Sequence, residues 1–137
     1  MTLLRWIDIE SENFQINVVE KQKYYKVKAN GNFNYRATLF ALVRLVCDYS
    51  LDSSYKIVMD FEETKLNFTN DEITGLINYI KHLQTFYSNR FSLILPRKHS
   101  DMATLIISRF NKEDVRMDYL QGSKNLNHWL KNTSEIK

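Results

Sequence analysis

The sequence predicts a single α/β domain with a mixed sheet of four to five strands and about four helices, in the order β-β-α-β-α-β-α-β-α. Segments with alternating or continuous apolar residues, typical of strands, take turns with segments whose apolar residues recur every three or four positions, typical of helices. The 137 residues, 44% hydrophobic and 26% charged, suit one globular domain, with a core over about 14–132 and no Pro/Gly-rich linker.

Two strands open the predicted domain. The first has apolar residues at alternate positions: Phe14, Ile16 and Val18. The second alternates in the same way, with lysines on its other face: Tyr25, Val27 and Ala29. The polar run 20–23 between them predicts an antiparallel hairpin, and residues 6–9 are a candidate for a short edge piece.

Three later segments also predict strands. Residues 55–61 and 91–95 are continuously apolar at their centres, which indicates burial on both faces, and Pro96 stops the second of them. Residues 115–119 alternate, with one apolar face: Val115, Met117 and Tyr119. Because helical patterns separate these segments, we expect mainly parallel pairing.

Four helices connect or follow these strands, each with a cap and an apolar stripe. After Asn34, the stripe is Leu39, Leu42, Val43 and Val46. Over 70–87, it is Ile73, Leu76, Ile77 and Ile80, extended by Leu83 and Tyr87. After Ser100, it is Ala103, Ile106, Ile107 and Phe110. A short last helix, capped by Ser123, turns three residues inward: Leu126, Trp129 and Leu130.

Composition argues against several classes of function. The net charge of +3 and the absence of a basic run make nucleic acid a poor partner, and no apolar run approaches the roughly 20 residues of a membrane helix. Without a signal peptide or a disulfide pair, we expect a cytoplasmic protein. The lone Cys47 is interpreted as a small core residue.

The segment "TNDE" at 69–72 matches the capping box Thr-x-x-Glu. We expect the Thr69 hydroxyl to accept from the Glu72 amide and the Glu72 carboxylate to accept from the Thr69 amide. Asp71 and Glu72 also suit the positive end of a helix dipole. A phosphate on Thr69 would be repelled by these two carboxylates, so capping is the favoured interpretation and phosphorylation the minor one.

The segments "YKIVMDFEETKLNFTNDEITGLINYI" and "FSLILPRKHSDMATLIISRF", together with the element order, resemble the STAS domain, in particular its SpoIIAA-like branch. The resemblance covers roughly residues 23–132. It implies the fold of bacterial anti-sigma-factor antagonists, which bind protein partners rather than catalyse. Those antagonists carry a phosphorylatable serine at the start of the second helix, usually within Asp-Ser-Ser-Gly. Thr69 lies at or beside that position, but Phe68 and Asp71 depart from the pattern.

A second loop completes the predicted binding surface. Arg97, Lys98 and His99 lie between a strand and a helix, at the sheet edge where ligands of α/β folds bind, and Asp60 ends the neighbouring strand. We therefore expect a protein partner to contact Asp60, the segment Thr69–Asn70–Asp71–Glu72 and this loop. A second copy of the chain is left open as that partner.

No catalytic, metal-binding or cofactor-binding motif is expected from the sequence. Glu62 and Glu63 should point apart on a strand, and the three histidines, His82, His99 and His128, have no zinc spacing. The sequence therefore predicts a non-enzymatic, regulatory interaction module. The alternatives are a carrier of a small apolar ligand or lipid, with a pocket between sheet and helices, and an enzyme whose catalytic group is not recognised.

Overall fold

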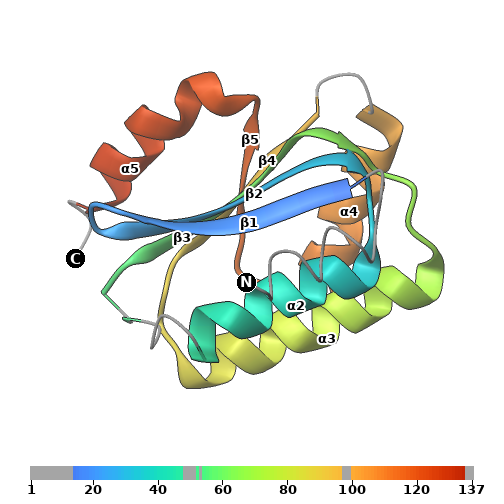
Figure 1. The fold of residues 1–137 in the computed structure, drawn as a ribbon, viewed down its shortest axis with the longest axis horizontal. Coiled ribbons are helices and arrows are strands. Elements are labelled where there is room, and N and C mark those ends of the chain that lie inside the picture. Colours follow the sequence, from blue (N-terminus) through green and yellow to red (C-terminus); the bar gives the residue numbers. More distant parts are fainter. Residues whose placement is uncertain (1–13, 48–51, 53, 97–99, 135–137) are drawn as a thin grey trace.

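The computed structural model describes residues 14–47, 52, 54–96 and 100–134. Its elements follow the predicted order (Figure 1): β1 (Phe14–Lys21), β2 (Tyr24–Asn32), α2 (Tyr35–Cys47), β3 (Lys56–Lys65), α3 (Asn70–Phe86), β4 (Phe91–Leu95), α4 (Ser100–Lys112), β5 (Asp118–Gln121), a 3-10 turn η1 (Ser123–Asn125) and α5 (Leu126–Ser134). The candidate edge piece at 6–9 lies outside the described residues.

The five strands form one mixed sheet in the order β1-β2-β3-β4-β5. β1 pairs antiparallel with β2, while β2, β3, β4 and β5 are parallel neighbours. The predicted α/β class, element order and mixed sheet are thereby confirmed. All four parallel strands end at one edge of the sheet, called here the carboxyl edge, where α2, α3 and α4 begin. They start at the opposite, amino edge.

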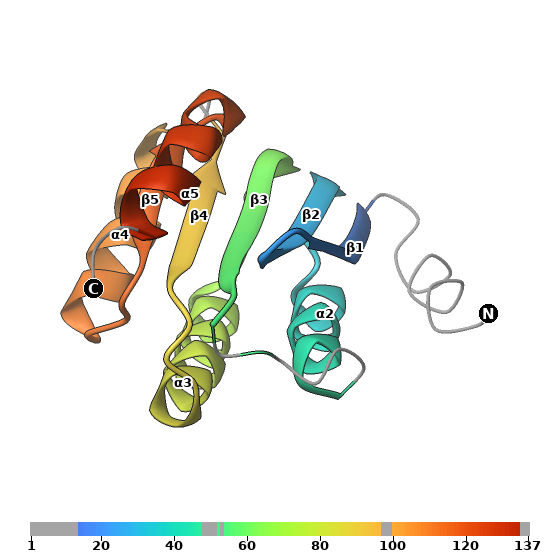
Figure 2. The ribbon, with the colours of Figure 1, turned by 90° about the vertical axis from the view of Figure 1, so that its left-hand side faces the viewer.

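The sheet lies between two layers of helices (Figure 2). α2, α3 and α4 cover one face, and their buried side chains share a single core with that face. α5 covers part of the other face, where Leu126 and Trp129 pack on Val58 of β3 and Ile94 of β4. β3 and β4 are therefore buried on both sides, as their continuous apolar runs predicted.

The first helix is rotated from the predicted orientation. Its buried residues are Ala37, Thr38, Ala41, Leu42 and Leu45. Of the predicted stripe, Leu42 is buried, whereas Leu39, Val43 and Val46 are only partly buried, and Cys47, expected in the core, is exposed. The predicted orientation was wrong because bulky apolar residues line more than one side of this helix. The small residues Ala37 and Ala41 face the core instead, and the periodicity of the bulky residues did not indicate this.

The end of the chain also differs in detail from the prediction. β5 begins at Asp118 rather than at 115, although Val115 is buried in the preceding turn. Ser123 does not cap the last helix, because η1 precedes that helix and has no side-chain cap bond. The Ser123 amide instead donates to Glu62 Oε1 at 3.1 Å.

Gly75 of α3 makes room for the Tyr35 ring, which comes from the first residue of α2. A methyl group at this position would run directly into the Tyr35 hydroxyl. The glycine therefore has a packing function inside a helix, where it would otherwise cost about 1 kcal/mol relative to alanine.

Candidate functional site

The start of α3 has the predicted capping box. The Glu72 amide donates to Thr69 Oγ1 at 3.2 Å, and the Thr69 amide donates to Glu72 Oε1 at 2.9 Å. Thr69 itself is extended, with φ −87° and ψ 168°, as an N-cap residue should be. The structure thus confirms that Thr69 begins the helix, and its hydroxyl is already engaged by the backbone.

Arg109 of α4 fixes this helix start from the side. One guanidinium nitrogen donates to Asn70 Oδ1 at 2.6 Å and another to Thr74 Oγ1 at 2.9 Å. Asn70, Asp71 and Thr74 are exposed, and the first two share one side of the helix with Thr74, which follows them by four and three residues. Arg109 therefore holds the exposed side chains of Asn70 and Thr74 in one arrangement.

An exposed leucine lies near Arg109 on α4. Leu105 is 45% exposed and lies one turn before Arg109 on the same side of α4. We call the combined surface of Asn70, Asp71, Thr74, Leu105 and Arg109 the α3–α4 surface. It combines an apolar side chain with polar ones, which is the composition of many protein interfaces.

Asp60 does not belong to this surface. It is only 1% exposed, and its carboxylate lies 3.6 Å from Lys26 Nζ and 3.5 Å from Lys28 Nζ. By strand alternation it shares a face with Val58, which contacts α5, whereas α3 packs on the other face. The structure therefore separates Asp60 from Thr69, although the sequence grouped them.

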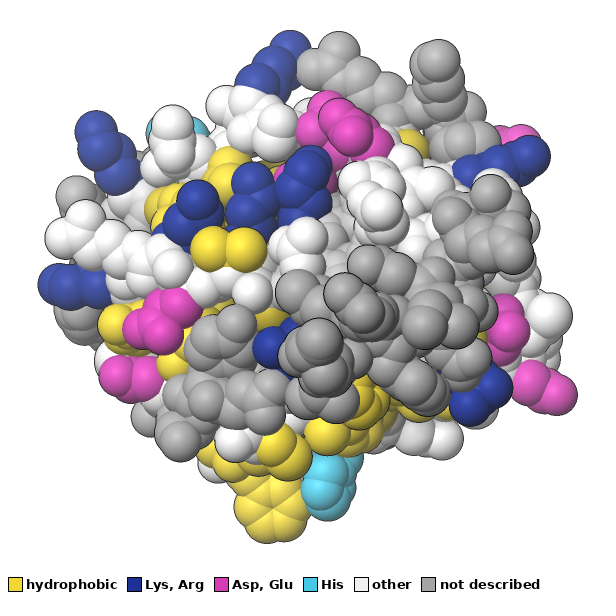
Figure 3. Space-filling view, viewed as in Figure 1, with side chains coloured by type: hydrophobic (Ala, Val, Ile, Leu, Met, Phe, Trp, Pro, Cys, Tyr) yellow, Lys and Arg dark blue, Asp and Glu magenta, His cyan; other side chains and the backbone are white. Residues whose placement is uncertain are grey.

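The lysines around Asp60 explain how a buried carboxylate is tolerated at this place. Its other oxygen accepts from the Glu62 amide at 3.1 Å, so both oxygens have partners. Figure 3 shows basic side chains beside acidic ones in the upper part of the face viewed from the β1 side of the molecule. The two lysines therefore offset the buried negative charge of Asp60.

A register shift in β3 changes the expected geometry of two carboxylates. Lys28 pairs with Asp60 but Asn30 pairs with Glu63, so β3 has one extra residue between these pairs. Residues paired across two strands share a face of the sheet, so Glu63 lies on the same face as Asp60. The neighbouring Glu62 accepts from the Ser123 amide. The alternation argument that turned Glu62 and Glu63 apart therefore fails at this bulge.

The predicted loop at 97–99 lies outside the described residues, and with it Arg97, Lys98 and His99. Of the other histidines, His82 and His128 are exposed. Within the ranges that the structure describes, no group of three or more His, Cys, Asp or Glu side chains could hold a metal ion. No helix in these ranges is long and apolar enough to cross a bilayer.

An apolar cavity lies between the sheet and the helices α3 and α4. It measures about 30 Å³ and is lined only by apolar side chains, among them Phe61, Ile80 and Phe110. Ligand pockets usually measure roughly 300–1,000 Å³. A lipid chain would fit here only after the helices had moved away from the sheet.

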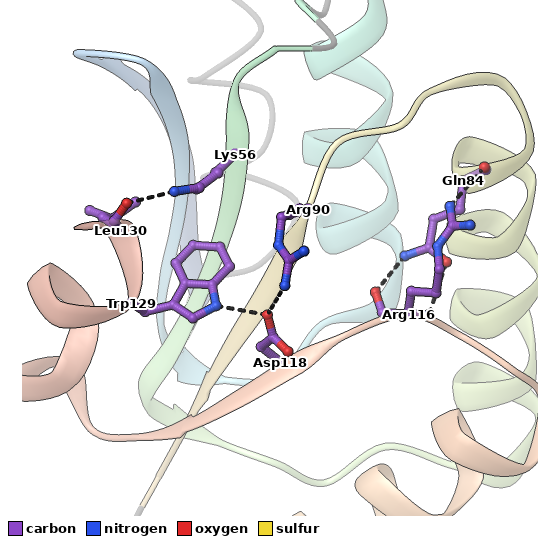
Figure 4. A network of polar contacts seen from close by, with 7 residues as sticks. All are labelled: Lys56, Gln84, Arg90, Arg116, Asp118, Trp129 and Leu130. Carbon is purple, nitrogen blue, oxygen red and sulfur yellow. Dashed lines mark hydrogen bonds and ion pairs between the residues drawn. The ribbon is translucent and has the colours of Figure 1, made fainter. Parts of the chain in front are cut away.

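A second polar network, which sequence reasoning missed, holds α5 to the sheet (Figure 4). Trp129 Nε1 donates to Asp118 Oδ2 at 2.7 Å, and the same oxygen lies 3.4 Å from Arg90 Nη2. Lys56 Nζ lies 5.5 Å from the Trp129 ring and donates to Leu130 O at 2.6 Å. The spacing of these residues along the chain gives no signal of their proximity.

Arg109 was missed for the same reason. It lies 39 residues from Asn70 in the sequence, and only the packing of α4 beside α3 brings the two together. Comparison with known proteins adds no relative: no protein-family model and no curated protein matches the chain.

Proposed function

We propose that this chain is a non-enzymatic, cytoplasmic interaction module with a regulatory role, and that its protein partner binds the α3–α4 surface. The observation that carries the proposal is the fixation of exposed polar groups at the start of α3 by the capping box and by Arg109. A surface whose side chains are already ordered loses less conformational entropy on binding than a mobile one.

The chemistry of the surface supports a partner with both polar and apolar groups. Asp71 offers a carboxylate, Asn70 an amide and Leu105 an apolar contact, all accessible to solvent. The resemblance to STAS domains supports the same location, because the antagonists among them are regulated at the start of the corresponding helix. In this chain the partner recognises the unmodified surface, since a phosphate on Thr69 would break the cap and meet Asp71 and Glu72.

The test is native mass spectrometry of the protein isolated from its own cells, compared among three variants. Asp71→Lys and Arg109→Glu alter the proposed surface, and each should abolish the co-purifying protein. Glu63→Lys is the matched control, because it makes the same charge change as Asp71→Lys at an exposed residue on the other face of the sheet.

The outcomes separate the hypotheses. Retention of the partner by both surface variants would contradict the proposed location. A mass increase of one phosphate that maps to Thr69 would favour the phosphorylation alternative instead. A bound small molecule without a protein partner would favour the carrier. Thermal unfolding of each variant shows whether the loss of binding reflects the surface or a loss of folding.

A further inference from the structure

A polar hollow of about 340 Å³ lies at the amino edge of the sheet, between the loops that lead into β4 and β5. Seven residues line it: Ser88, Asn89, Arg90, Phe91, Arg116, Met117 and Asp118. Because α3 begins at the carboxyl edge, the hollow and the α3–α4 surface lie at opposite edges of the sheet. A function of the hollow is therefore independent of the function proposed above.

Arg116, on one wall of the hollow, is held in place through its backbone. Its amide donates to Gln84 Oε1 at 3.0 Å, and its carbonyl accepts from Gln84 Nε2 at 2.7 Å. One guanidinium nitrogen donates to the Gln84 carbonyl at 3.1 Å, in the last turn of α3. Among the described residues, no carboxylate pairs with Arg116, so its charge is not neutralised by an ion pair.

Arg90, on the other wall, has a partner that it can exchange. Its pair with Asp118 spans 3.4 Å, and the two side chains are 47% and 44% exposed. Exposed pairs of this kind contribute only about 0–1 kcal/mol. Asp118 would keep its 2.7 Å bond from Trp129 if Arg90 turned to another anion, so the exchange leaves no carboxylate without a donor.

We infer that this hollow binds a small oxyanion, a phosphate or a carboxylate, through Arg90 and Arg116. The two guanidinium groups and the single carboxylate of Asp118 give the lining a formal charge of +1. Planar guanidinium groups match the paired oxygens of both anions. Ser88 adds a hydroxyl to the wall, whereas the Asn89 amide nitrogen already donates to the carbonyls of Asp52 and Tyr55. The volume lies at the lower end of the range for ligand pockets.

Trp129 provides the reporter for a direct test, because anion binding at Arg90 changes the surroundings of the Asp118 carboxylate that accepts from its indole. The chain has two tryptophans, so Trp6→Phe leaves Trp129 as the only one, and excitation at a wavelength that tyrosine does not absorb isolates its emission. We would titrate this protein with inorganic phosphate and, separately, with citrate, at constant ionic strength. A fluorescence change that saturates with phosphate would identify the ligand of the hollow as a phosphate. A change that saturates with citrate alone would identify it as a carboxylate.

Variants decide whether the response comes from the hollow. Arg90→Gln and Arg116→Gln should each weaken binding at least about tenfold, the effect of losing a hydrogen bond to a charged group. Lys124→Gln, which removes one positive charge from an exposed residue of η1, should leave the affinity unchanged. No saturation by either anion, or equal weakening by Lys124→Gln, would overturn the inference.

A second measurement keeps the inference testable if the variants fold poorly. In the unmodified chain, phosphate or citrate should shift the amide resonances of Asn89, Arg90 and Arg116 along one saturable curve. Shifts confined to other parts of the protein would overturn it as well.

Discussion

The capping box at the start of α3 allows a quantitative test of what Thr69 does. Thr69→Ala removes the acceptor of the 3.2 Å bond from the Glu72 amide. Loss of such a cap costs about 1 kcal/mol of stability. For a domain of this length, that corresponds to a fall in the melting temperature of roughly 3–4 °C.

Calorimetry on matched variants separates capping from other functions of the side chain. Thr69→Ser and Thr69→Asp keep a capping oxygen and should melt within about 1 °C of the parent. In a double-mutant cycle, Thr69→Ala and Glu72→Ala should cost less together than the sum of the single changes, because each bond belongs to the same box. An unchanged melting temperature in Thr69→Ala would refute the capping account.

Three further changes test contacts that only the structure revealed. Asp60→Ala should lower the free energy of unfolding by about 1–2 kcal/mol in urea titrations, less than for a fully buried pair because both lysines reach water. Trp129→Phe loses the bond to Asp118 and should cost about 1–2 kcal/mol by the same assay, while a change below about 0.3 kcal/mol would argue against that bond. Tyr119 has a buried hydroxyl with no partner among the described residues, and burial, helped by the Asp118 charge, raises its pKa from 10.0 to about 12. Its neutral form is favoured in the fold, so the parent should lose stability as the pH rises from 10 to 12. Tyr119→Phe should lose less over this range, although Tyr55 and Tyr79, whose pKa values are also raised, still contribute, and it should be equally or more stable at pH 7. A steeper alkaline loss in the variant would contradict this.

In the elements that the sequence predicted correctly, the apolar residues follow a single clear periodicity or the interaction is local. β1 alternates strictly and buries Phe14, Ile16 and Val18, and the Thr-x-x-Glu box is local enough for its hydrogen bonds to follow from four residues. The first helix has apolar residues on more than one side, so periodicity alone could not tell which of them would face the sheet.

The parts that could not be predicted depend on distant contacts. Nothing near Asp60 in the sequence shows that Lys26 and Lys28 lie beside it, because the parallel pairing of β2 with β3 creates that cluster. The register shift between the Asp60 and Glu63 pairs likewise has no recognisable pattern in the sequence. The sequence placed Asp60 near the start of α3 because the predicted strand ended beside it. Asp60 lies instead inside β3, which continues to Lys65, and side chains on opposite faces of a sheet do not meet.

Site-specific photo-crosslinking in cells tests the central claim, that a partner binds the α3–α4 surface, most directly. A photoreactive phenylalanine derivative would replace Asp71 or Leu105 on that surface, and Lys124 as an exposed control on η1. We predict the same discrete protein adduct from positions 71 and 105 and none from position 124. An adduct from position 124 alone would show that the partner binds elsewhere and would contradict the account.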